Sequence, residues 1–83
     1  MKVLLTFPSI HYVLKAEKLI KGLELFTDMV PVPKEISSDC GMALLVREED
    51  LVRIKSLLKE RGLPLEGIYQ KQGKGFVPYP SAP

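Results

Sequence analysis

Hydrophobic residues along this chain form two kinds of pattern, short continuous runs and stripes at helical spacing. Residues 3–7 and 41–46 are apolar almost throughout, which is typical of strands in the middle of a sheet. Residues 25–32 and 65–70 mix apolar and polar positions and predict edge strands. Pro31 supports an edge position for the first of these, because proline cannot donate a hydrogen bond to a neighbouring strand.

Two segments between these runs have helical periodicity. In residues 9–23 the apolar side chains recur at intervals of three and four, Ser9 stands at the N-cap position, and Gly22 provides a stop signal. A second helix is expected to open with the acidic residues 48–50, which suit the positive end of a helix dipole, and to stop at Gly62.

The resulting order of strand, helix, strand, strand, helix, strand predicts an α+β fold. We expect a ferredoxin-like βαββαβ two-layer sandwich, with an antiparallel sheet in the order 4-1-3-2 and both helices on one face. Residues 1–71 form the predicted domain. Residues 72–83 contain several prolines and glycines and predict a flexible tail.

Composition and charge narrow the function classes. With 46% hydrophobic and 27% charged residues, the 83-residue chain matches one globular domain rather than a disordered segment. Its net charge is only +2 and its basic residues are scattered among acids, so nucleic acid is not an expected partner. The apolar run at the start breaks at Thr6 and Pro8, and no run is long enough to span a membrane, so we expect a cytoplasmic protein without membrane contact.

Cys40 is the only cysteine, so its chemistry would be that of a single thiol. The predicted topology places the loop from Lys34 to Cys40 near Ser9 and His11, at the start of the first helix, where the helix dipole and a cation favour a thiolate. Ser37 and Ser38 are expected to donate hydrogen bonds to a charged sulfur. Gly41 would let the backbone approach that sulfur closely.

Other interpretations of the same residues stay open. A free cysteine is often a buried small hydrophobe, and a histidine in a first helical turn is often a solvated surface residue. A metal shared between subunits through Cys40 and His11 is a further alternative, whereas no metal site within one chain is expected. No glycine-rich phosphate loop precedes a helix, so no cofactor is expected, and a chain this short offers little cleft for a hydrolase.

The most specific pattern is the segment 31–41, Pro-Val-Pro-Lys-Glu-Ile-Ser-Ser-Asp-Cys-Gly. With Phe7-Pro8-Ser9 before it and Gly67-Ile68-Tyr69 after it, residues 2–70 resemble the selenium/sulfur carrier-like family of small proteins. In that family a glycine usually stands at the position of Glu24, and here Gly22 is expected to serve instead.

The resemblance implies that Cys40 is the carrier thiol within the recurring context of Ser37, Ser38 and Gly41. The predicted topology adds Ser9, His11 and Lys34 as supporting residues. The resemblance also implies a carrier of sulfur or selenium rather than a turnover enzyme, with a donor enzyme similar to a cysteine desulfurase and an acceptor protein that the residues do not identify. The alternative is a regulatory or protein-interaction module in which Cys40 is structural. In that case the sheet would form a homodimer through the edge that lacks Pro31 or through its open face.

Overall fold

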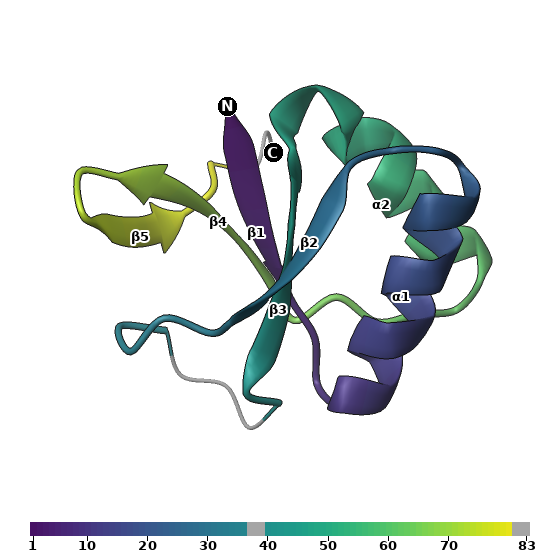
Figure 1. Cartoon of the computed structure of the whole chain (residues 1–83), viewed down its shortest axis with the longest axis horizontal. Helices are drawn as coiled ribbons and strands as arrows, with labels where there is room; N and C mark the ends of the chain where they lie inside the picture. Colours follow the sequence, from purple (N-terminus) through teal and green to yellow (C-terminus); the bar gives the residue numbers. More distant parts are fainter. Residues whose placement is uncertain (37–39, 81–83) are drawn as a thin grey trace.

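The computed structural model describes residues 1–36 and 40–80, which form one sheet, two α-helices and a short 3-10 helix (Figure 1). The strands are β1 (Lys2–Thr6), β2 (Thr27–Pro31), β3 (Met42–Arg47), β4 (Gly67–Gln72) and β5 (Gly75–Pro78). The helices are α1 (Ile10–Gly22), the 3-10 helix η1 (Glu48–Asp50) and α2 (Leu51–Glu60).

The sheet has the strand order β2-β3-β1-β4-β5, and every pair of neighbours is antiparallel. The two strands that were predicted to be central, β1 and β3, have a neighbour on each side. The strand that ends in Pro31 lies at an edge, as its proline predicted. The predicted α+β class and the placement of these three strands are therefore confirmed.

The prediction of a four-stranded βαββαβ sheet in the order 4-1-3-2 is wrong in its strand count. That order is present, but β5 pairs with β4, so β4 is not the edge strand that its sequence predicted. A two-residue turn joins the two strands, with Gln72 opposite Gly75 and Gly73 at a φ of 63°. Glycine adopts this left-handed conformation without the steric cost that other residues bear.

The end of the predicted domain at residue 71 and the flexibility of residues 72–83 stay predictions. The structure adds that part of this predicted tail is a strand of the sheet. Pro78 is the last residue of β5, which is an edge strand of the sheet. Because no further strand lies beyond this edge, none is left without a donor by the N–H that proline lacks.

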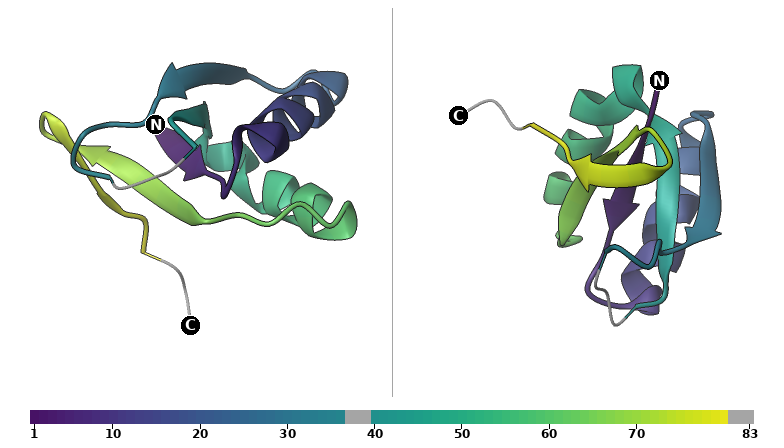
Figure 2. Two further views of the ribbon diagram at one scale, coloured as in Figure 1. Left: turned by 90° about the horizontal axis from the view of Figure 1, so that it is seen from below. Right: turned by 90° about the vertical axis from the view of Figure 1, so that its left-hand side faces the viewer.

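Both helices cover the same face of the sheet, and Figure 2 shows them side by side behind the strands. Each helix buries residues at intervals of three or four against alternate residues of β1 and β3, because side chains two apart on a strand share a face. The buried cluster on this face, here called the helix-face core, consists of Val3, Leu5, Phe7, Val13, Ala16, Ile20, Leu44, Val46, Leu51, Ile54, Leu58 and Leu63.

The opposite face of the sheet has a smaller buried cluster, here called the open-face cluster, formed by Leu4, Ile36 and Ala43. No helix of the described residues covers it. Instead, Ile36 of the connection between β2 and β3 lies on it, and Phe76 of β5 packs against it. The open face is therefore closed by a loop segment and a hairpin (Figure 2, left).

The connection from α1 to β2 corrects one further expectation. Gly22 is the last residue of α1, and it is Glu24 that has a positive φ, of 60°. The residue with the left-handed backbone is thus at the position where the family usually has glycine. Gly22 does not adopt this conformation in its place. A glutamate there is strained by about 1–2 kcal/mol relative to a glycine in the same conformation.

Candidate functional site

The end of the sheet that carries Cys40 is also the end at which α1 begins. Thr6, the last residue of β1, pairs with Ala43 near the start of β3. The chain therefore leaves β1 toward α1 at the same end at which it enters β3 from Cys40, and Figures 1 and 2 show these segments together at the bottom of the sheet. Cys40 and the start of α1 thus lie at one end of the sheet, whereas Ile36 of the same loop packs on the face opposite α1.

The Cys40 side chain lies on the helix side of the sheet and is partly exposed. It packs against the helix-face core, as do the partly buried Tyr12 and Met42. Its Sγ donates a hydrogen bond to the backbone oxygen of Met42 at 3.2 Å. Because a thiolate has no proton to donate, this hydrogen bond belongs to the protonated thiol.

Gly41 positions this cysteine through its backbone conformation. Its φ is +80°, and apart from its two chain neighbours a Cβ at this position would meet no atom within 4 Å. The glycine therefore suits the left-handed turn into β3, and its close approach to the sulfur of Cys40 stays a prediction. Its carbonyl oxygen accepts a hydrogen bond from the backbone N–H of Val32 at 3.1 Å, which closes the base of the cysteine loop.

The other predicted site residues are spread around this end of the molecule. Ser9 is the N-cap of α1, but its hydroxyl makes no capping hydrogen bond, and its carbonyl oxygen accepts from Tyr12 and Val13. His11 is exposed and contacts Tyr12 edge to face, with ring centroids 5.7 Å apart. Lys34 is exposed in a turn of the loop. Ser37 and Ser38 lie outside the described residues.

Two residues that the sequence did not single out hold the cysteine loop against the sheet. The backbone N–H of Phe76 in β5 donates to Oε2 of Glu35 at 3.1 Å. Ile36 is only 7% exposed and packs in the open-face cluster beside Phe76. The apolar Ile36 between polar neighbours was a signal of burial, but the partner of Glu35 lies in a strand that the sequence did not predict.

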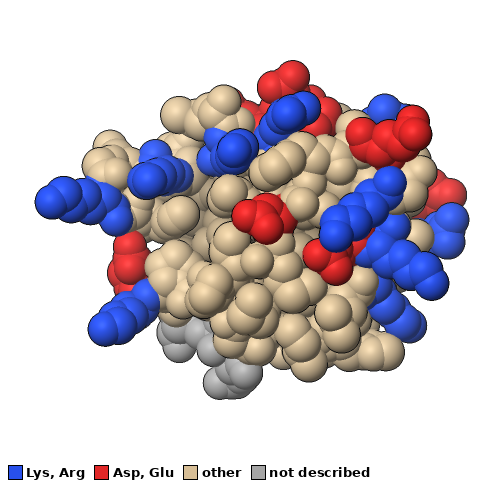
Figure 3. All heavy atoms as spheres, in the orientation of Figure 1, with Lys and Arg blue, Asp and Glu red and all other residues tan. Residues whose placement is uncertain are grey.

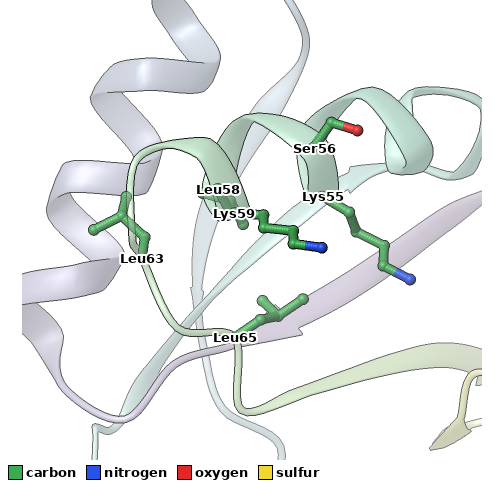
Figure 4. A pocket seen from close by; sticks show the side chains of 6 residues that line it. All are labelled: Lys55, Ser56, Leu58, Lys59, Leu63 and Leu65. Carbon is green, nitrogen blue, oxygen red and sulfur yellow. The ribbon is translucent and has the colours of Figure 1, made fainter.

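A groove between α2 and the connection to β4 lies apart from this site. Figure 4 shows its floor of Leu58, Leu63 and Leu65, with Lys55 and Lys59 extending beside it, and its volume is about 370 Å³. Across residues 1–36 and 40–80, no group of three or more potential metal ligands is present. None of the helices in these ranges has the length and apolar character needed to cross a membrane.

Fold and site together define a small α+β domain that presents one partly exposed thiol where a loop meets a central strand. The family model "Putative Se/S carrier protein-like" matches residues 2–70. The chain belongs to this family, and its recognition from the segment 31–41 is confirmed.

A relative from Aquifex aeolicus (strain VF5), named "Putative sulfur carrier protein", is 38% identical over 74 residues. The match covers 87% of this chain and 38% of that protein, so the chain spans well under half the length of its relative. No solved structure gives a significant match.

Proposed function

We propose that the protein carries sulfur or selenium on Cys40 between a donor enzyme and an acceptor protein. The observation that supports this most is the position of the only cysteine, partly exposed beside a positive-φ glycine, in a chain of the Se/S carrier-like family. The name of the Aquifex aeolicus relative agrees with a carrier role. The cytoplasm, which keeps thiols reduced, is the compartment that suits this chemistry.

In the proposed loading step, the Cys40 thiolate attacks the terminal sulfur of a persulfide on the donor. A sulfur–sulfur bond to Cys40 forms, the sulfur–sulfur bond of the donor breaks, and the donor thiolate leaves with its electron pair. In the unloading step an acceptor nucleophile attacks the terminal sulfur, and the Cys40 thiolate leaves. Selenium in the terminal position would follow the same course, as a selenenylsulfide.

The residues near Cys40 have supporting roles in this proposal. The hydrogen bond from Sγ to the carbonyl of Met42 must break when the thiol loses its proton. The start of α1 lies at the same end and offers backbone N–H donors to an anion. Ser9, His11, Lys34, Ser37, Ser38 and Gly41 are proposed as the surroundings of the carrier thiol.

Intact-mass measurement tests the proposal directly. The protein is incubated with a cysteine desulfurase and cysteine, and a mass increase of one sulfur atom is expected in the wild type and not in Cys40→Ser. A carrier of known activity is loaded in parallel. If that carrier gains sulfur and this protein does not, the sulfur-carrier function is wrong.

A second candidate function is an interaction module in which Cys40 is structural. It is favoured by the packing of Cys40 against the helix-face core and by its hydrogen bond to Met42. Iodoacetamide separates the two candidates. A carrier requires alkylation of Cys40 in the folded protein, whereas alkylation only after denaturation supports the structural role.

A further inference from the structure

At the end of the sheet away from Cys40, one row of side chains crosses the open face. Arg47 of β3 pairs with Lys2 of β1, and Phe76 of β5 pairs with Lys71 of β4. Between β1 and β4, Val3 pairs with Gln70. The next residues along the two antiparallel strands are Lys2 and Lys71, so these two lysines lie side by side. Lys2 shares a face with Leu4 of the open-face cluster, because side chains two apart on a strand point the same way.

Among residues 1–36 and 40–80, the exposed positive charges of this row form no ion pair with an acidic side chain. Like charges on neighbouring strands destabilise a sheet unless something compensates them. In the described part of the chain, one ion pair is present, between Lys21 and Glu17 on α1. None of the described carboxylates therefore lies within 4.0 Å of the charged nitrogens of Lys2, Arg47 or Lys71. In Figure 3 the blue spheres follow one another from the β4–β5 hairpin across the upper part of the view.

A groove of about 660 Å³ runs between Lys2 and Lys71. It is lined by Met1, Lys2, Leu45, Lys71, Gly73 and Phe76. Leu45 and Phe76 give it apolar walls beside the two ammonium groups. A groove of this kind, apolar with a few charged groups at its margin, suits a peptide segment with acidic and apolar side chains.

The aromatic residues of the row argue against a nucleic acid as the occupant. Nucleic acid strands stack their bases on free aromatic faces. The Phe26 ring is covered by Nζ of Lys2 at 4.6 Å and by the guanidinium of Arg47 at 5.4 Å, and Phe76 packs in the open-face cluster.

The charge pattern of the neighbouring row points the same way. Asp28 of β2 pairs with Leu45, which places a carboxylate on the open face one row from the cations. A peptide can place an apolar or cationic side chain beside Asp28, whereas every unit of a nucleic-acid backbone carries a negative charge.

We propose that this groove, here called the basic groove, binds an acidic segment of a partner protein. Carboxylates of the segment would pair with Lys2, Arg47 and Lys71, and its apolar side chains would contact Leu45 and Phe76. The basic groove is at the opposite end of the sheet from Cys40, so a partner held here leaves the thiol end of the sheet uncovered. The inference goes beyond the carrier function and does not depend on it.

Fluorescence anisotropy tests the binding, with a labelled peptide in which glutamate and leucine alternate as the probe. The double variant Lys2→Glu with Lys71→Glu should weaken binding about tenfold or more, and added salt should weaken wild-type binding. The control is Lys55→Glu with Lys59→Glu on α2, which makes the same change in net charge. These lysines line the separate groove of Figure 4 and not the basic groove. This control should bind the peptide as the wild type does.

Three results would overturn the proposal: no binding of the peptide to the wild type, equal weakening by both double variants, or tighter binding of a single-stranded DNA oligonucleotide at the basic groove. If charge reversal unfolds the chain, Lys2→Gln with Lys71→Gln serves in its place. Cys40→Ser should bind the peptide normally, so a failure of the carrier function and a failure of the basic groove are distinguishable.

Discussion

The two faces of the sheet are closed in different ways. The helix face buries a large cluster under α1 and α2, whereas the open face buries Leu4, Ile36 and Ala43 under a loop segment and the β4–β5 hairpin. The first cluster contains most of the fully buried side chains and should carry most of the stability. The second is small, but its cover is the segment that leads to Cys40.

The difference implies that one set of residues determines the stability of the fold and another set determines the reactivity of Cys40. β5 links the two faces, because Phe76 packs on the open face while Tyr79, just beyond the strand, packs against the helix-face core. Substitutions in the helix-face core, apart from those in contact with Cys40, should lower the free energy of unfolding with little specific effect on Cys40. Substitutions on the open face should cost less stability and change the reactivity of Cys40 more.

The largest effect is expected for Ile54→Ala in the helix-face core. Ile54 is fully buried in α2, and its truncation removes apolar contacts and leaves a cavity. The free energy of unfolding should fall by about 2–5 kcal/mol, measured by urea denaturation. Val52 on the same helix is 79% exposed, so Val52→Ala should change it by less than about 0.5 kcal/mol. Equal losses in the two variants would contradict the assignment of this core.

Ile36→Ala should lower the free energy of unfolding by about 2 kcal/mol, the lower end of the range for a buried isoleucine, because the open-face cluster is small. The alkylation rate of Cys40 by iodoacetamide in native buffer should rise more than it does in Ile54→Ala, since Ile36 anchors the loop that leads to the cysteine. An unchanged alkylation rate would show that the open face does not position the thiol.

Glu35→Ala should change the reactivity of Cys40 while leaving the free energy of unfolding almost unchanged. The hydrogen bond from Phe76 to Glu35 is exposed, so its loss should cost no more than about 1 kcal/mol. The alkylation rate of Cys40 should nevertheless rise, because the loop loses its attachment to β5. Glu35→Gln keeps an acceptor oxygen and should restore the wild-type rate. Failure of this rescue would assign the effect to charge and not to the hydrogen bond.

The sequence predicted those parts of the molecule that depend on local pattern. The apolar runs placed β1 and β3 in the centre, Pro31 placed β2 at an edge, and the order of elements brought Cys40 to the end of the sheet at which α1 begins. These features follow from side-chain periodicity and from proline chemistry, which act within a few residues.

The sequence did not predict what depends on contacts between distant segments. A hairpin was indicated by Gly73 and Lys74, which stand between two short stretches that contain apolar residues. The prolines that follow favoured a flexible tail instead of a second strand. Without β5, the roles of Glu35 and Ile36 could not be seen, because their partner Phe76 is about forty residues away along the chain. Glu24 was missed for another reason, since a glutamate carries no sign of a positive φ.

The smallest effect is expected for Tyr79, just beyond β5, whose side chain hydrogen-bonds to Glu48 on the helix side of the sheet. The Tyr79 hydroxyl donates to Oε2 of Glu48 at 2.6 Å, next to the start of α2. This hydrogen bond, together with desolvation and the negative charge of Glu48, raises the pKa of Tyr79 above 10.0. A raised pKa means that the folded state favours the neutral phenol, so the stabilisation is complete below pH 10.0 and is lost as pH rises through the folded-state pKa.

Tyr79→Phe should therefore have a slightly lower melting temperature than the wild type at neutral pH, and the difference should shrink above pH 10.0. The alkylation rate of Cys40 should stay at the wild-type value, in contrast to Glu35→Ala, because the Glu48 contact lies on the helix side and not on the open face. A difference in melting temperature that is the same at both pH values would mean that the hydroxyl stabilises the protein through packing alone. A faster alkylation of Cys40 in Tyr79→Phe would mean that β5 transmits changes between the two faces, and the separation of stability from thiol control would fail at this strand.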